Sequence, residues 1–159
     1  MTHERMTGSF VALITPFNAD GSIDFEGFRT LLQFHADNGT RAVLIMGSTG
    51  EVSMLSPEER RQVISETVKM KTGALKLFYG CTGNNTATTI EYLQYAEKEG
   101  ADGAILAAPA YICADEADIE AYFLKAQFAK RRHGLVIAAS RQALGDGWSP
   151  SSMRWNHLR

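Results

Sequence analysis

Two patterns of apolar and polar residues alternate along this chain. Four short runs are almost continuously apolar, which is typical of strands buried on both faces of a parallel sheet. Between these runs, apolar residues recur every three or four positions, which predicts helices with one buried face. The predicted strands cover residues 8–14, 41–46, 74–79 and 103–108.

The predicted helices carry recognisable start and stop signals. Gly39 is placed to end the first helix, because glycine readily adopts the left-handed conformation found there. Ser56 is a predicted N-cap, with Pro57 at the first helical position and Glu59 completing a capping box. The helices are predicted over about residues 24–38, from Ser56 onward, over about residues 85–99 and from near Asp115.

The strands begin at an almost constant spacing along the chain. Their starts near residues 9, 42, 75 and 104 are separated by 33, 33 and 29 residues. A repeat of this length is a strand–helix unit, and right-handed crossovers between such units build a doubly wound sheet or a (β/α)8 barrel. The sequence therefore predicts an α/β protein of four to five units, with a fifth strand at 135–139.

Composition and charge exclude several classes of function. The chain has 159 residues, 45% hydrophobic and 21% charged, as expected for one globular domain with a substantial core. Its net charge of −2 argues against nucleic acid or an anionic membrane as the main partner. No apolar run approaches the roughly 18 residues of a membrane span, and no signal peptide is recognisable. We therefore expect a cytoplasmic protein.

Cysteine and histidine residues do not form a recognisable site. Cys81 and Cys113 lack CxxC spacing, so we expect small, buried, reduced thiols. The four histidines are scattered, and no metal site is predicted. Tyr79 and Tyr122 are interpreted as core or helix-face residues.

The last part of the chain differs in composition from the rest. Residues 131–159 carry five arginines, no lysine and one acidic residue, a net charge of +4, whereas residues 1–130 carry a net charge of −6. Glycine, serine and proline in this tail are typical of a loop or a disordered segment. Two interpretations remain open: a flexible extension, or a segment translated out of frame.

A pair of hydroxyl residues between two glycines follows the second strand. In Gly47-Ser48-Thr49-Gly50-Glu51, backbone N–H groups and two hydroxyls can bind a small carboxylate. The carboxylate of Glu51 is expected to hold the turn by accepting hydrogen bonds from backbone donors. Taken alone, the segment is better explained as a tight exit from a strand with no ligand.

Further motifs occur at or after the other predicted strands, and together with residues 47–51 they form a recognisable pattern. They are Gly8-x-x-x-Ala12-x-x-Thr15-Pro16-Phe17, Pro109-Ala110-Tyr111 and the weaker glycine-rich turn at 80–84. Over about residues 7–130 the chain resembles the superfamily of 4-hydroxy-tetrahydrodipicolinate synthase and N-acetylneuraminate lyase. Its members are pyruvate-handling class I aldolases on a (β/α)8 barrel. The resemblance implies that residues 1–130 form the N-terminal half of such a barrel and that 131–159 are an atypical tail.

The resemblance also implies roles for particular residues. Gly47, Ser48, Thr49 and Gly50 would bind the carboxylate of pyruvate or a similar 2-oxo acid, and Ser48 would join a relay of protons. Tyr111 would be a catalytic residue, which the synthase branch lends across a dimer interface; a packed aromatic residue at an interface is the alternative. No cofactor is expected.

Two parts of the family's chemistry have no match in this sequence. The family forms its Schiff base on a lysine at the end of the sixth strand and places a relay tyrosine on the fifth, whereas residues 136–141 read VIAASR and no lysine follows Lys130. Lys76 lies near the start of a strand, away from the end where barrel sites form. Without an amine the iminium of pyruvate cannot form, so this chain is predicted to be an inactive, truncated lyase.

Two alternatives accompany this interpretation. The first is a non-catalytic half-barrel that binds a ketoacid, or that associates with itself or with a full-length paralogue. Self-association is expected in either case, because four or five units leave strand edges and an apolar interior exposed. The second is a doubly wound binding module, which requires an alternating strand order and helices on both faces of the sheet.

Overall fold

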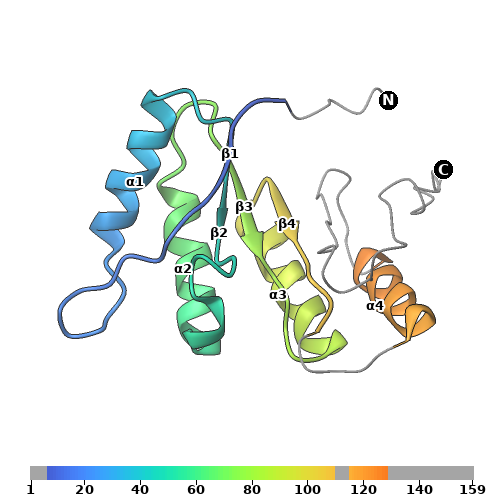
Figure 1. The fold of residues 1–159 in the computed structure, drawn as a ribbon. Coiled ribbons are helices and arrows are strands. Elements are labelled where there is room, and N and C mark those ends of the chain that lie inside the picture. The colour runs from blue at the N-terminus through green and yellow to red at the C-terminus, as the bar shows by residue number, and fades with distance from the viewer. Residues whose placement is uncertain (1–6, 110–114, 129–159) are drawn as a thin grey trace.

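The chain alternates strands with helices, as its apolar pattern predicts (Figure 1). The computed structural model describes residues 7–109 and 115–128. The predicted fifth strand at 135–139 lies outside the described residues. The strands are β1 (Phe10–Ala12), β2 (Ala42–Ile45), β3 (Lys76–Gly80) and β4 (Gly103–Ile105), and the helices are α1 (Phe25–Asp37), η1 (Val52–Met54, a single 3-10 turn), α2 (Pro57–Lys69), α3 (Thr86–Glu99) and α4 (Glu116–Phe128).

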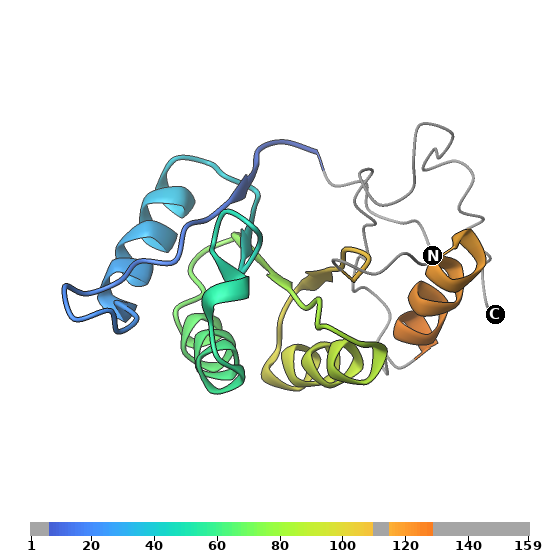
Figure 2. The same cartoon turned by 60° about the horizontal axis from the view of Figure 1, so that its bottom comes forward.

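The four strands form one parallel sheet in the order β1-β2-β3-β4. Helix α1 packs against α2, α2 against α3, and α3 against α4. The helices follow one another along one face of the sheet (Figure 2). A doubly wound sheet would reverse its strand order and carry helices on both faces, so that alternative is wrong. The described residues form four consecutive units of a partial (β/α)8 barrel.

One face of the sheet forms the main core with the helices. Tyr79 is fully buried, and its hydroxyl lies 2.8 Å from the Thr67 hydroxyl of α2. Burial raises the pKa of Tyr79 well above its ordinary value, so the phenol stays protonated. Tyr122 of α4 is also buried and pairs with Thr89 of α3 at 3.0 Å, so the expectation for both tyrosines is confirmed. Other buried members of this core are Val43, Ile45, Leu77, Ala104, Phe28, Leu32, Val63, Ile64, Leu93 and Ala96.

The opposite face of the sheet is also apolar, but part of it is exposed. Phe10 is 45% exposed and Ile14 is 54% exposed. Phe78 is covered, because the Phe10 ring meets it edge-on at 5.3 Å between centroids. A Cβ at Gly103 would lie 2.2 Å from the Phe78 ring, so this ring lies over the glycine of β4. This face corresponds to the interior of a closed barrel.

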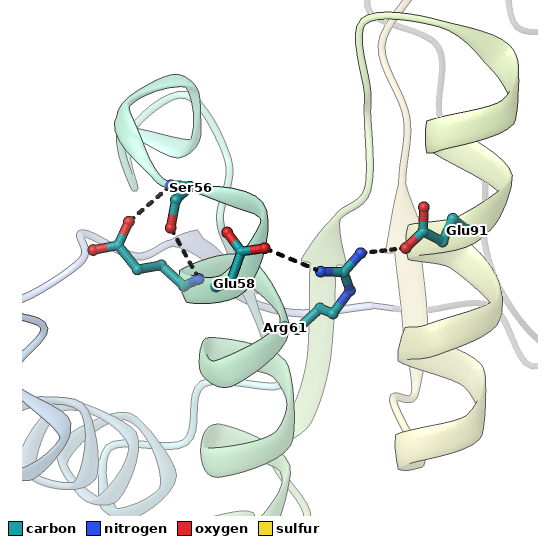
Figure 3. A network of polar contacts seen from close by, with 5 residues as sticks. Ser56, Glu58, Arg61 and Glu91 are labelled. Atoms are coloured by element: carbon teal, nitrogen blue, oxygen red, sulfur yellow. Dashed lines mark hydrogen bonds and ion pairs between the residues drawn. The ribbon is translucent and has the colours of Figure 1, made fainter.

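The helix ends follow the signals read from the sequence. Asp24, Ser56 and Asn85 are N-caps, and each side chain accepts a hydrogen bond from a backbone N–H three residues later. The capping box is present, since Glu59 accepts from the Ser56 N–H at 2.7 Å, and this bond lowers the pKa of Glu59 (Figure 3). Gly39 follows the C-cap of α1 with φ +74°, as expected for its predicted role as a stop.

The ends of β2 and β3 approach each other closely at Gly80. A Cβ on Gly80 would lie 1.9 Å from the carbonyl oxygen of Met46. Met46 itself has φ +58°, a left-handed conformation that is uncommon for residues with a side chain. Glycine at position 80 is therefore what allows the chain to leave β2 in this conformation.

Replacing Gly80 with alanine should destabilise the protein. We expect Gly80→Ala to lower the free energy of unfolding by about 2–3 kcal/mol, because the new methyl group meets backbone that no rotamer change can move. Urea unfolding followed by far-UV circular dichroism measures the loss. Gly73→Ala is the control, because Gly73 has φ +54° and open space around it. This variant should lower the free energy of unfolding by only about 1 kcal/mol, the cost of a left-handed backbone at alanine. Equal losses in the two variants would contradict the steric explanation.

Candidate functional site

Residues 47–51 form two successive tight turns at the carboxyl end of β2. The Gly50 N–H donates to the Gly47 carbonyl at 3.0 Å, and the Glu51 N–H donates to the Ser48 carbonyl at 3.1 Å. Glu51 has φ +54° and leads into η1. The segment thus lies at the end of the sheet where (β/α)8 barrels place their active sites.

Ser48 and Thr49 are exposed and keep their donors free. Neither the hydroxyls nor the backbone N–H groups of these two residues donate to any residue that the structure describes. The N–H groups are free because the first donors of a helical turn have no acceptor within the turn. Two adjacent residues therefore present four hydrogen-bond donors without a fixed positive charge, a set suited to a carboxylate.

Thr15, three residues after β1, holds this loop from one side. Its hydroxyl is buried and donates to the Gly50 carbonyl at 2.6 Å. Gly50 is closely surrounded, since an added Cβ would lie 3.1 Å from the Leu13 carbonyl oxygen and 3.2 Å from the Met46 nitrogen. Thr15 belongs to a motif recognised in the sequence but received no role there. The contact joins residues 35 positions apart, and no local pattern predicts it.

Arg60 of α2 holds the loop from the other side. Its Nη2 donates to the Val52 carbonyl at 2.7 Å, and its Nη1 donates to the Thr82 carbonyl at 3.2 Å. The guanidinium lies 5.3 Å from the centre of the Tyr92 ring. Sequence reasoning missed Arg60, because it is one of several charged residues in the first two turns of α2.

The loop after β3 is linked in turn to the segment after β4. The Thr82 hydroxyl accepts a hydrogen bond from the Ala107 N–H at 2.8 Å. Together with the contacts of Thr15 and Arg60, this bond joins the carboxyl ends of all four described strands. The candidate site therefore has a hydrogen-bonded rim rather than four independent loops.

Two further residues were given roles from the sequence, Tyr111 and Glu51. Tyr111 lies outside the described residues, so its predicted role stays a prediction. The Glu51 carboxylate makes no hydrogen bond to any described residue. The expectation that it holds the turn is wrong, because backbone bonds and Thr15 hold the turn instead.

The lysines of the described segments lie away from the loop. Lys76 is the first residue of β3 and lies 3.5 Å from a carboxylate oxygen of Asp102, at the opposite end of the sheet. Lys71 follows α2 and pairs with the same aspartate at 2.6 Å. The remaining ones, Lys69, Lys98 and Lys125, lie in helices. Among the residues that the structure describes, no lysine lies at the carboxyl end of a strand.

Three other kinds of site can be checked within residues 7–109 and 115–128. No three histidine, cysteine, aspartate or glutamate side chains there lie close enough to hold a metal ion. No helix in these segments has the length and apolar character needed to cross a bilayer. Cys81 is fully buried, and desolvation raises the pKa of its thiol to about 12. It is thus the small buried thiol predicted from the sequence, whereas Cys113 lies outside the described residues.

Solved structures of similar fold cover most of this chain. The crystal structure of dihydrodipicolinate synthase from Aquifex aeolicus matches with a TM-score of 0.78 and 36% identity, over 84% of this chain and 44% of that one. The chloride-inhibited dihydrodipicolinate synthase from Acinetobacter baumannii, complexed with pyruvate, matches with a TM-score of 0.77 and 31% identity. That match covers 83% of this chain and 44% of the other.

Sequence comparisons agree with the structural ones. The 4-hydroxy-tetrahydrodipicolinate synthase of Aquifex aeolicus is 44% identical over 104 residues, which are 65% of this chain and 35% of that protein. The chain thus spans about a third of the length of this curated relative. The model of the dihydrodipicolinate synthetase family matches residues 5–131. The chain belongs to the dihydrodipicolinate synthetase family.

Proposed function

We propose that residues 47–50 bind the carboxylate of pyruvate or a similar 2-oxo acid. The observation that carries this proposal is the set of four unpartnered donors on Ser48 and Thr49 at the carboxyl end of β2. A related enzyme from Acinetobacter baumannii was solved with pyruvate, which supports this class of ligand. Gly47 and Gly50 would shape the turn, and the Ser48 hydroxyl would pass a proton beside the bound acid.

The reaction that such a site serves is the condensation of pyruvate with an aldehyde. In a class I aldolase an amine must first convert the ketone into an iminium, which makes the methyl group acidic. The described lysines lie on helices or at the opposite end of the sheet. We therefore infer that this chain alone binds the ketoacid in the cytoplasm without completing the lyase reaction, and that Tyr111 contributes only in an assembled site.

Removing the hydroxyls should weaken pyruvate binding. We expect Ser48→Ala and Thr49→Val each to raise the Kd by about 10- to 100-fold, because a hydrogen bond to a charged group contributes about 1.5–3 kcal/mol. Titration of the 159-residue chain with pyruvate, followed by backbone amide NMR, measures the Kd. Ser53→Ala is a matched control, since Ser53 is an exposed serine of η1 without a hydrogen bond to any described residue.

Two results would contradict this proposal. The first is an unchanged Kd in both variants, or no binding of pyruvate by the unmodified chain. The second is a covalent adduct with pyruvate after borohydride treatment, which would show that a lysine of this chain does form the Schiff base. We expect the intact mass to stay unchanged.

A second candidate function is assembly with another copy of this chain. Phe10 and Ile14 leave an apolar row exposed on the face of the sheet that a closed barrel buries. Strands β1 and β4 are also the two edges of the described sheet, and each presents unpaired backbone groups. A second half-barrel would cover both features.

Association through this face should respond to a charge placed on it. We expect the unmodified chain to sediment as a dimer or larger species and Ile14→Lys to shift it toward monomer, because a buried lysine is costly to desolvate. Phe34→Lys is the control, since Phe34 is 59% exposed on α1 and lies away from the sheet. Analytical ultracentrifugation measures both. A monomeric wild-type chain with cooperative unfolding would rule out this assembly.

We also propose that residues 131–159 are read out of frame from an aldolase gene. The family match ends at residue 131, where the charge changes sign. Translating the DNA downstream of the Phe128 codon in three frames should reveal a tyrosine-bearing fifth strand and then a strand that ends in lysine. Their absence from every frame would rule out this proposal.

A further inference from the structure

The candidate loop is bracketed by two strained residues. Met46, before it, has φ +58°, and Glu51, at its end, has φ +54°. Left-handed backbone at residues other than glycine persists only where neighbouring contacts hold it. The conformation that exposes the donors of Ser48 and Thr49 therefore depends on contacts from outside the loop.

Three such contacts are present, and they differ in what they reach. The Thr15 hydroxyl donates a hydrogen bond to the Gly50 carbonyl. The Met46 carbonyl packs closely against Gly80, where a side chain would not fit. Both act between neighbouring strands. Arg60 alone joins the exit of the loop, at Val52, to the loop after β3, at Thr82.

The burial and the contacts of the Arg60 side chain favour a role beyond the stability of its own helix. Its Nε is buried and has no hydrogen-bond partner among the described residues. Buried donors are nearly always paired, so this position has a cost that the two bonds to carbonyl groups and the contact with Tyr92 must offset. The guanidinium donates to the two carbonyls from two separate nitrogens of a rigid planar fork, whereas a lysine ammonium would have to reach both carbonyls from a single nitrogen.

We propose that Arg60 is a positioning residue that couples the loop 47–51 to the loop after β3. It does not contact Ser48 or Thr49, so it acts through the Val52 and Thr82 carbonyls. The Thr82 hydroxyl extends this coupling to Ala107, which precedes Tyr111 by four residues. The effect on ligand binding rests on the proposed function, whereas the coupling of the two loops does not.

Arg61 provides a matched control in the same helix. It is the next residue, but its guanidinium points to the surface, where it pairs with Glu58 of α2 and Glu91 of α3 (Figure 3). It contacts neither loop carbonyl. Each replacement at Arg61 therefore changes the charge of α2 as the same replacement at Arg60 does, without removing a hydrogen bond to either loop carbonyl.

The test combines hydrogen exchange with pyruvate affinity on the 159-residue chain. In Arg60→Lys and Arg60→Met, we expect exchange of the hydrogen-bonded amides within residues 47–55 and within residues 80–84 to rise about tenfold together, with α2 itself unchanged. We also expect the Kd for pyruvate to rise at least about threefold, although Arg60 does not contact the proposed ligand site. Arg61→Lys and Arg61→Met should change neither quantity.

The possible results separate this inference from the proposed function. If the unmodified chain does not bind pyruvate, the proposed function fails, and the exchange pattern alone still decides the coupling. Faster exchange in residues 47–55 without a change in 80–84 would overturn the coupling. Faster exchange throughout the sheet and helices in Arg60→Lys would also overturn it, because Arg60 would then be a general stabilising residue.

Discussion

Parallel pairing of β2 with β3 places the loop 47–51 beside the loop after β3, and the rest of the candidate site depends on this pairing. Parallel strands cannot be joined by a hairpin, so the chain must leave β2, pass outside the sheet as α2 and re-enter at the start of β3. The first turn of such a crossover helix lies at the carboxyl rim of the sheet. Arg60, in the first turn of α2, is therefore near both loops for a topological reason.

The elements themselves were predictable, because their signals are local. The capping box at Ser56 and the stop at Gly39 each depend on residues within one helical turn. The strands were predicted too long, and β1 shows why. Along 8–14 the burial varies, with Leu13 buried and Phe10 and Ile14 exposed. A barrel strand is apolar on both faces, so its apolar run extends past the few residues that have pairing partners.

The candidate site could be proposed from the sequence only where its residues are contiguous. Ser48 and Thr49 are adjacent, and two hydroxyls between glycines are a local signal of an anion site. Thr15 and Arg60 act on the same loop from positions far along the chain or on another element, so no periodicity identifies them. The error at Glu51 has a related cause. A carboxylate beside a turn often accepts hydrogen bonds from the backbone of that turn. Here the turn is held instead by the left-handed backbone at Glu51 and by the hydrogen bond from the Thr15 hydroxyl.

Binding and catalysis make different demands on the barrel. The contacts that hold the proposed carboxylate loop come from Thr15, Arg60 and Gly80, all within the first three strand–helix units. The geometry of this loop therefore needs little beyond β1, β2, β3 and α2. Schiff-base chemistry needs an amine at the same rim, and the described lysines lie elsewhere. The described segments thus hold the conformation of the proposed carboxylate loop by themselves, whereas among these segments no lysine lies at the same rim.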